Sequence, residues 1–181
     1  MTKIDKSIKD LKQLFSEQEI LIRVKELASD IENIFPPDET IYAVCVLKGS
    51  FMFASDLVKY IKRNVKMEFI RVSSYGNETK SGGSMQALDL TLPDLNGENV
   101  LIIEDIIDTG LTAQFLIDMF KLKHQPKKLV FVSLLNKKCA RKISIEPDLY
   151  GFEIDNKFAA GYGMDYKGYF RNLPYIGCFD V

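Results

Sequence analysis

Apolar residues recur at helical spacing in the segment that follows Ser16. Ser16 and Glu19 also have the spacing of a capping box, in which a serine and a glutamate satisfy free N–H groups at a helix N-terminus. The periodicity stops before Pro36, because a proline ring is incompatible with a helix interior. The pattern therefore predicts an amphipathic helix. Its buried face is expected to consist of Ile20, Val24, Leu27, Ile31 and Ile34.

Continuous apolar runs follow this helix, and such runs are typical of strands that are buried on both faces of a sheet. The runs cover residues 41–47, 65–72, 100–103 and 129–135. Helical periodicity between them predicts further helices over residues 51–61 and 111–123. Strands that alternate with helices predict an α/β fold with a central, mostly parallel sheet flanked by helices.

The last third of the chain has a different character, with many glycines and short strand patterns separated by turns. From about residue 146 onward it predicts a small hood over the sheet. We expect a single domain over residues 1–181, with a core at about 16–145. The hood would comprise about 146–181 together with N-terminal residues.

Residues 73–87 break the alternation of strands and helices. The segment is polar, contains Gly76, Gly82 and Gly83, and has no helical period. A connection of this length inside a compact domain usually has a function or is disordered. We therefore expect a mobile lid at about 73–87.

The bulk composition excludes several functional classes. Among 181 residues, 46% are hydrophobic, 27% are charged and the formal net charge is −1. This balance gives no electrostatic reason to expect nucleic acid or an anionic membrane as a partner. No apolar run reaches the roughly 20 residues that span a bilayer. The three cysteines are widely spaced and no secretion signal is evident, so we expect a reducing, cytoplasmic location.

Residues 101–113 are the most informative stretch of the chain. A buried strand runs into two adjacent carboxylates, Glu104 and Asp105, and then into the turn Asp108-Thr109-Gly110-Leu111-Thr112 and a helix. Ligands of open α/β sheets bind at the carboxyl ends of the strands. The free N–H groups of a helix N-terminus suit a phosphate, and carboxylates suit a divalent cation or sugar hydroxyls. The stretch therefore predicts a site for a phosphorylated sugar.

Two other interpretations fit parts of this stretch. Glu104 and Asp105 can simply be solvated residues where the strand enters a loop, and Asp108 can be the N-cap of the helix. Apolar residues before Asp-Thr-Gly also occur where an aspartic protease presents its catalytic acid. That enzyme needs two such carboxylates, whereas the motif occurs once here and is followed by a helix.

Residues 101–113 resemble the phosphoribosyl-pyrophosphate signature of the purine phosphoribosyltransferases. Residues 16–179 as a whole resemble the hypoxanthine-guanine phosphoribosyltransferase family. The segments that carry the wider resemblance are Val46–Ser50, Phe69–Tyr75, Ser133–Lys137, Gly151–Ile154 and the pair Asp165-Tyr166 with Tyr169-Phe170-Arg171.

The resemblance implies a type-I phosphoribosyltransferase fold and an enzyme of purine salvage. The family moves the 5-phosphoribosyl group of phosphoribosyl pyrophosphate to hypoxanthine or guanine, with Mg²⁺, and releases pyrophosphate with IMP or GMP. The implied partners are these small molecules and a second copy of the chain, as a homodimer or homotetramer. An enzyme for another base such as xanthine, or a non-catalytic regulator of the same fold, remain alternatives.

The resemblance also assigns roles to residues of the phosphoribosyl site. Asp108 is the general acid/base beside the purine, and Asp108, Thr109, Gly110, Leu111 and Thr112 hold the 5′-phosphate. Glu104 and Asp105 bind the ribose hydroxyls directly or through magnesium.

The remaining roles concern pyrophosphate, the base and the lid. Arg171 and Lys48-Gly49 would bind pyrophosphate, and the family has a cis peptide between the residues that correspond to Leu47 and Lys48. The residues that would bind the base are Lys137, Phe158, Ala159 and Asp165. Asp165 would also be a magnesium ligand. The lid is marked by Ser74 and Tyr75. Ala159 and Asn136 depart from the larger aliphatic and the apolar residue that are common there, which leaves the preferred purine open.

Overall fold

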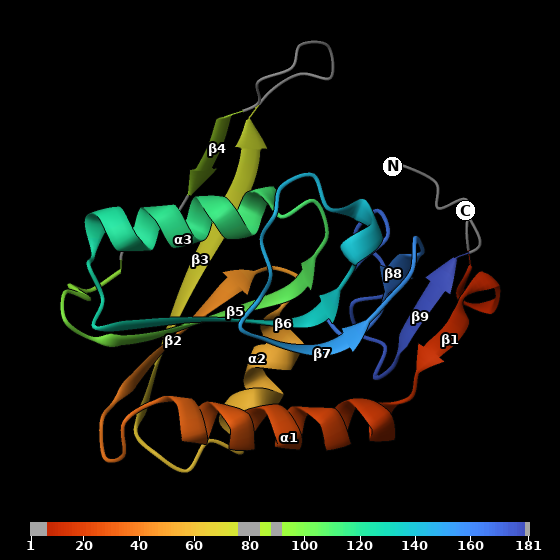
Figure 1. Cartoon of the computed structure of the whole chain (residues 1–181). Helices are drawn as coiled ribbons and strands as arrows, with labels where there is room; N and C mark the ends of the chain where they lie inside the picture. The colour runs from red at the N-terminus through yellow and green to blue at the C-terminus, as the bar shows by residue number, and fades with distance from the viewer. Residues whose placement is uncertain (1–6, 76–83, 88–91, 180–181) are drawn as a thin grey trace.

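The computed structural model describes residues 7–75, 84–87 and 92–179, and these residues form two sheets (Figure 1). The larger sheet has six strands in the order β4-β3-β2-β5-β6-β7. All neighbouring pairs are parallel except β3 with β4. Its strands are β2 (Ile41–Leu47), β3 (Val65–Tyr75), β4 (Ser84–Ala87), β5 (Asn99–Ile107), β6 (Lys128–Asn136) and β7 (Leu149–Glu153). The predicted α/β fold with a mostly parallel central sheet is confirmed.

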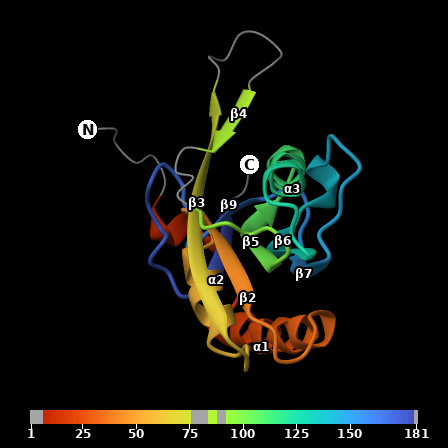
Figure 2. The same cartoon turned by 90° about the vertical axis from the view of Figure 1, so that its left-hand side faces the viewer.

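Helices cover both faces of this sheet. Helix α3 (Leu111–Lys123) lies on one face, while α1 (Glu17–Ile34) and α2 (Phe51–Val58) lie on the other (Figures 1 and 2). Successive strand residues therefore enter two different cores. Val100 and Ile102 of β5 pack with α3, whereas Leu101 and Ile103 pack with α1 and α2. The strands are buried on both faces, as their continuous apolar runs predict.

Local sequence signals set the helix boundaries. Ser16 caps α1 through its hydroxyl, and the Glu19 carboxylate returns to the Ser16 N–H at 2.8 Å, so the predicted capping box is confirmed. Helix α2 ends at Val58, short of the predicted Ile61, which still packs in the same core. Two short 3-10 helices, η1 (Ile8–Asp10) and η2 (Lys138–Ala140), complete the helical elements of the described residues.

The second sheet joins the two ends of the chain. It has the order β1-β9-β8, formed by β1 (Lys12–Phe15), β8 (Phe158–Ala160) and β9 (Ile176–Phe179). The hood was expected from about residue 146, but β7 (Leu149–Glu153) pairs with β6 in the central sheet. The cause is the apolar stretch around Phe152, which packs against the α1 core, whereas the separate sheet begins only at Phe158.

The expected lid has regular structure at both ends. Strand β3 continues through Ser74 to Tyr75, and Ser73, Ser74 and Tyr75 pair with β4 in antiparallel register. The sequence pattern did not indicate these two strand segments, because β4 is defined by its pairing with β3 rather than by an apolar run. Residues 76–83 lie outside the described residues, and the motion of the segment stays a prediction. Within the described chain, no helix combines the length and apolar character required to cross a membrane.

Candidate active site

The turn between β5 and α3 is shaped by Gly110, which has φ of +85° and is the N-cap of α3. The N-cap glycine has no side chain to cap this helix, and the Thr109 hydroxyl accepts the Leu111 N–H at 3.4 Å. The remaining N–H groups of the first turn can bind an anion. Asp108 is therefore not the N-cap, contrary to the alternative considered from the sequence. Its carboxylate instead accepts the N–H of Thr109 at 2.5 Å and is exposed.

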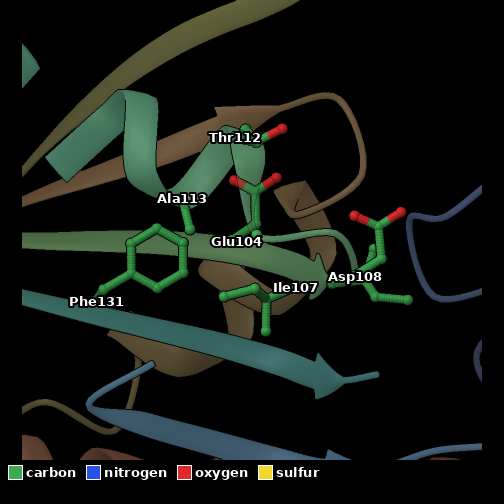
Figure 3. Close-up of a pocket in the computed structure, with 8 residues that line it drawn as sticks. Glu104, Ile107, Asp108, Thr112, Ala113 and Phe131 are labelled. Carbon is green, nitrogen blue, oxygen red and sulfur yellow. The ribbon is translucent and has the colours of Figure 1, made fainter. Parts of the chain in front are cut away.

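Glu104 and Asp105 point to opposite faces of the sheet, since successive strand residues alternate. Glu104 shares a small pocket with Asp108 and Thr112, on the α3 side (Figure 3). Figure 3 shows the Glu104 carboxylate directed toward the first turn of α3, with Asp108 beyond the end of β5. Asp105 lines a different pocket, together with Lys137 and Asp165. The two adjacent acids thus serve two neighbouring pockets at one sheet edge.

Burial disfavours the charged form of both acids. Glu104 is 9% exposed, and burial raises its pKa well above the ordinary range, with further contributions from the charges of Asp105 and Asp108. Its Oε2 is buried without a hydrogen-bond partner. Burial also raises the pKa of Asp105 to about 6, partly offset by backbone hydrogen bonds and by Arg171. A cation or a hydroxyl donor would satisfy these oxygens.

The second pocket has a volume of about 200 Å³. This exceeds a cavity of roughly 150 Å³ that admits benzene, so it has room for a larger flat ring. Six residues that the family resemblance assigned to the site line it, namely Asp105, Asp108, Lys137, Phe158, Ala159 and Asp165. The structure thus brings residues from four separate segments of the chain into one pocket.

Lys137 and Phe158 offer the polar and apolar contacts of this pocket. The Lys137 ammonium donates to the Lys157 carbonyl at 3.0 Å, which holds the side chain over the pocket. The Phe158 ring is 43% exposed and meets Tyr166 edge-on, with ring centroids 5.5 Å apart. A partly exposed aromatic ring that lines the pocket suits stacking on a flat ligand.

The loop after β2 is packed between two parts of the site. The Leu47–Lys48 peptide is cis, as the family resemblance implies. A Cβ at Gly49 would lie 1.9 Å from Asp105 Oδ2, and a Cβ at Gly163 would lie 2.2 Å from the Gly49 carbonyl oxygen. Gly49 therefore fits only because it has no side chain.

Arg171 and Asp165 form an ion pair close to Gly163, the residue that packs against Gly49. Arg171 also donates to the Gly163 carbonyl at 2.7 Å, and the Asp165 carboxylate accepts the Gly168 N–H at 2.6 Å. The pair links a guanidinium suited to phosphates with a carboxylate suited to a cation.

Comparison with known proteins identifies this arrangement. A model of the phosphoribosyl transferase domain matches residues 10–167. Hypoxanthine-guanine phosphoribosyltransferases of Bacillus subtilis and Aquifex aeolicus are 43% and 44% identical over 92% and 93% of this chain, and over 91% and 94% of their own lengths. The chain belongs to the hypoxanthine-guanine phosphoribosyltransferase family.

Solved structures of the family agree with the fold. A hypoxanthine-guanine phosphoribosyltransferase from Bacillus anthracis has a TM-score of 0.87 and 44% identity, covering 93% of this chain and 98% of its own. A Trypanosoma cruzi hypoxanthine phosphoribosyltransferase in complex with its product IMP has a TM-score of 0.86 and 37% identity, covering 97% of both chains. The central sheet and the family together rule out the aspartic protease interpretation.

Three residues of the larger pocket were not among the site residues predicted from the sequence. Ile106, Met164 and Lys157 line the larger pocket as well. The Lys157 carbonyl oxygen accepts a hydrogen bond from the Lys137 ammonium. Ile106 and Met164 carried no signal, because apolar residues in strand and turn patterns are assigned to the core.

The residues also fit a magnesium ion. Mg²⁺ prefers oxygen ligands and usually combines one or two carboxylates with substrate oxygens and water. Glu104 Oε2 is a buried oxygen without a partner, and Asp105 lies on the adjacent position of β5. In the described part of the chain, no group of three acidic, histidine or cysteine side chains encloses a metal. A substrate-bridged ion therefore fits better than a closed protein site.

Proposed function

We propose that this chain transfers the phosphoribosyl group of phosphoribosyl pyrophosphate to hypoxanthine and guanine, giving IMP or GMP and pyrophosphate. The observation that carries the proposal is the position of Asp108. It lines both the pocket at the α3 N-terminus and the pocket that holds Lys137 and Phe158. A phosphorylated sugar bound at the N-terminus of α3 and a flat base in the second pocket would meet at its carboxylate.

The reaction breaks the bond between ribose C1 and a pyrophosphate oxygen while a purine nitrogen forms a bond to C1. Positive charge develops on the ribose, as in glycoside cleavage. The turn Asp108–Thr112 would hold the 5′-phosphate through N–H groups and the hydroxyls of Thr109 and Thr112. The enzyme thereby supplies positioning and electrostatic stabilisation rather than a covalent intermediate.

Asp108 and Lys137 would interact with different parts of the base. The Asp108 carboxylate would accept or stabilise the proton that the purine loses. The Lys137 ammonium would donate to the 6-oxo group, and Phe158 would stack on the ring. Adenine has an amino group at that position, so a donor there favours oxopurines.

Arg171 and Lys48 would stabilise the departing pyrophosphate. Arg171 pairs with Asp165 in this structure. When pyrophosphate binds, Arg171 would exchange the Asp165 carboxylate for a pyrophosphate oxygen. Bound magnesium would supply charge neutralisation on the ribose hydroxyls and pyrophosphate, with Glu104, Asp105 and Asp165 as the protein oxygens available to hold it.

A spectrophotometric assay tests the proposal with phosphoribosyl pyrophosphate, Mg²⁺ and one purine at a time. We expect nucleotide formation with hypoxanthine and guanine, little with adenine, and loss of activity when EDTA removes the metal. A rate with xanthine that exceeds both would assign a different base. No turnover with any purine would leave a non-catalytic regulator.

A further inference from the structure

The segment that follows β6 returns to the phosphate turn and is anchored to it at two successive carbonyls. We define this return segment as residues 137–146. Arg141 Nη1 donates to the Asp108 carbonyl oxygen at 2.6 Å, and the Lys142 N–H donates to the Thr109 carbonyl oxygen at 3.0 Å. Both acceptors belong to the turn that would hold the 5′-phosphate.

These two contacts set the direction of the N–H groups in the turn. In a planar trans peptide, the carbonyl and the N–H of the next residue point in opposite directions. When Arg141 fixes the Asp108 carbonyl, the Thr109 N–H is directed away from Arg141, and it donates to the Asp108 carboxylate at 2.5 Å. Lys142 fixes the Gly110 N–H in the same manner through the Thr109 carbonyl. The Thr109 N–H thus holds the Asp108 carboxylate, and a Gly110 N–H fixed in this way needs no reorganisation when an anion binds.

Arg141 is itself held by a buried polar group. Its side chain is 11% exposed, and its Nη2 donates to Asn136 Oδ1 and lies 3.9 Å from a Glu146 carboxylate oxygen. Asn136 is fully buried, and its Nδ2 donates to Glu146 at 3.0 Å. A guanidinium with one Nη2 acceptor fixed by a buried side chain presents its Nη1 donor in a fixed orientation.

The same network reaches the base pocket. Asn136 is the last residue of β6 and directly precedes Lys137, whose N–H donates to the Ile107 carbonyl at 2.9 Å. Ile107 in turn directly precedes Asp108. The residue that would bind the purine and the turn that would bind the phosphate thus share one set of hydrogen bonds.

Packing keeps the return segment against the turn. A Cβ added to Gly110 would lie 2.5 Å from Ile145, 3.0 Å from Ile143 and 3.2 Å from Arg141. The segment therefore occupies the space directly beside the N-cap of α3, and Arg141 cannot swing away without opening a gap there.

We propose that Arg141, held by Asn136, is a positioning residue that orients the N–H donors of the phosphate turn and the carboxylate of Asp108 for phosphoribosyl transfer. The inference rests on the proposed function, because it assigns the turn to the 5′-phosphate. Arg141 would not touch substrate: it acts through the Asp108 carbonyl. Its loss would weaken donor binding and turnover, and would leave the affinity for the purine largely intact.

The test compares Arg141→Met with wild type at saturating purine and at saturating donor. A lost hydrogen bond from a charged group corresponds to roughly a 10- to 100-fold change. We expect the KM and the calorimetric Kd for magnesium phosphoribosyl pyrophosphate to rise by that factor and kcat to fall. The KM for hypoxanthine should stay within about twofold, the range of independent sites. Millimolar guanidinium chloride should partly restore donor binding.

Arg23→Met is the control, because the Arg23 guanidinium, like that of Arg141, donates to the backbone, here to the carbonyls of Tyr150 and Gly151 at 2.8 and 3.0 Å. Arg23→Met should lower the melting temperature, but it should not raise the KM for phosphoribosyl pyrophosphate relative to the KM for hypoxanthine. Arg141→Lys keeps the charge and one donor, so it should lie between wild type and Arg141→Met even if the latter folds poorly. Asn136→Val should shift the same donor parameters by a smaller factor, roughly 2- to 10-fold.

Three results would overturn the inference. One is an Arg141→Met enzyme with wild-type donor KM and kcat. Another is an Arg141→Met enzyme in which the KM values for donor and purine rise equally and in proportion to the loss of stability. A third is an Arg141→Lys enzyme with wild-type kinetics, together with an Arg141→Met enzyme whose donor binding guanidinium does not restore. Activity of the wild-type enzyme separates these results from failure of the proposed function, since an inactive wild type would overturn both.

Discussion

The Asp105 carboxylate lies against the backbone of Gly49, so that a Cβ at Gly49 would stand 1.9 Å from Oδ2 and 2.3 Å from Cγ. The contact joins the end of β5 to the loop that follows β2, two parallel strands that are neighbours in the sheet. It also fixes the distance between a carboxylate suited to magnesium and a loop suited to pyrophosphate. The absence of a side chain at Gly49 is therefore a requirement of the site.

Gly49→Ala should displace Asp105 and reduce activity. Overpacking of this kind typically costs about 1–3 kcal/mol, so we expect kcat/KM for phosphoribosyl pyrophosphate to fall roughly 10- to 100-fold. Gly97→Ala is the control: Gly97 has φ of +73° but no atom within 4 Å of an added Cβ. It should lower stability and leave donor kinetics unchanged. Wild-type donor kinetics in Gly49→Ala would contradict the steric explanation.

Asp105→Asn should stabilise the metal-free protein in a pH-dependent manner. Burial raises the pKa of Asp105 from 3.8 to about 6, so the folded state holds the proton more tightly than the unfolded chain. The stability that this group contributes at low pH is therefore lost as the pH rises from about 4 to about 6. The asparagine stays neutral, so its gain in melting temperature should be larger at pH 7.5 than at pH 4.5, measured by calorimetry in EDTA.

Glu19→Gln provides the control of opposite sign. Hydrogen bonds from Ser16 hold the pKa of Glu19 below its ordinary value, so its ionised form favours the folded state. Its contribution is present above the ordinary carboxyl pKa and is lost as the pH falls. The glutamine variant should be less stable than wild type at pH 7.5, with the difference shrinking toward pH 4. A pH-independent gain in Asp105→Asn would show that burial is not its cause.

Lys137→Met should reduce kcat/KM for hypoxanthine and guanine about 10- to 100-fold, because a buried polar group of the substrate would lose its donor at a cost of roughly 1–3 kcal/mol. Discrimination against adenine should also weaken. Lys138→Met is the matched control, since Lys138 is exposed and pairs with Glu153 at 2.8 Å. If both variants keep wild-type purine kinetics, Lys137 has no part in recognising the base.

The sequence predicted those features that depend on neighbours in the chain. Ser16 and Glu19 are three residues apart, and the strand, acid pair and turn of 101–113 are contiguous, so their patterns could be seen directly. Lys137, Phe158 and Arg171 came from the family resemblance, since nothing local distinguishes them from surface or core residues.

Contacts between distant segments could not be predicted. Arg141 lies 33 residues from the Asp108 carbonyl that it holds, and Met164 reaches the base pocket only because the chain turns back at Gly163. Strand β4 is specified by its pairing with β3 rather than by apolar residues. In each case the determining partner is brought close by the fold and is absent from the local sequence.

Asp108→Asn should lower kcat and leave donor binding nearly intact. The amide preserves the shape of the side chain, and its oxygen can still accept the Thr109 N–H that the carboxylate now binds at 2.5 Å. It cannot accept the purine proton, and general acid–base catalysis typically contributes about 10²- to 10⁴-fold. Asp118→Asn, an exposed acid of α3 that pairs with Gln114, should retain wild-type kinetics. Single-turnover measurements with hypoxanthine would separate chemistry from product release, and an unchanged chemical step would remove Asp108 from the proton transfer.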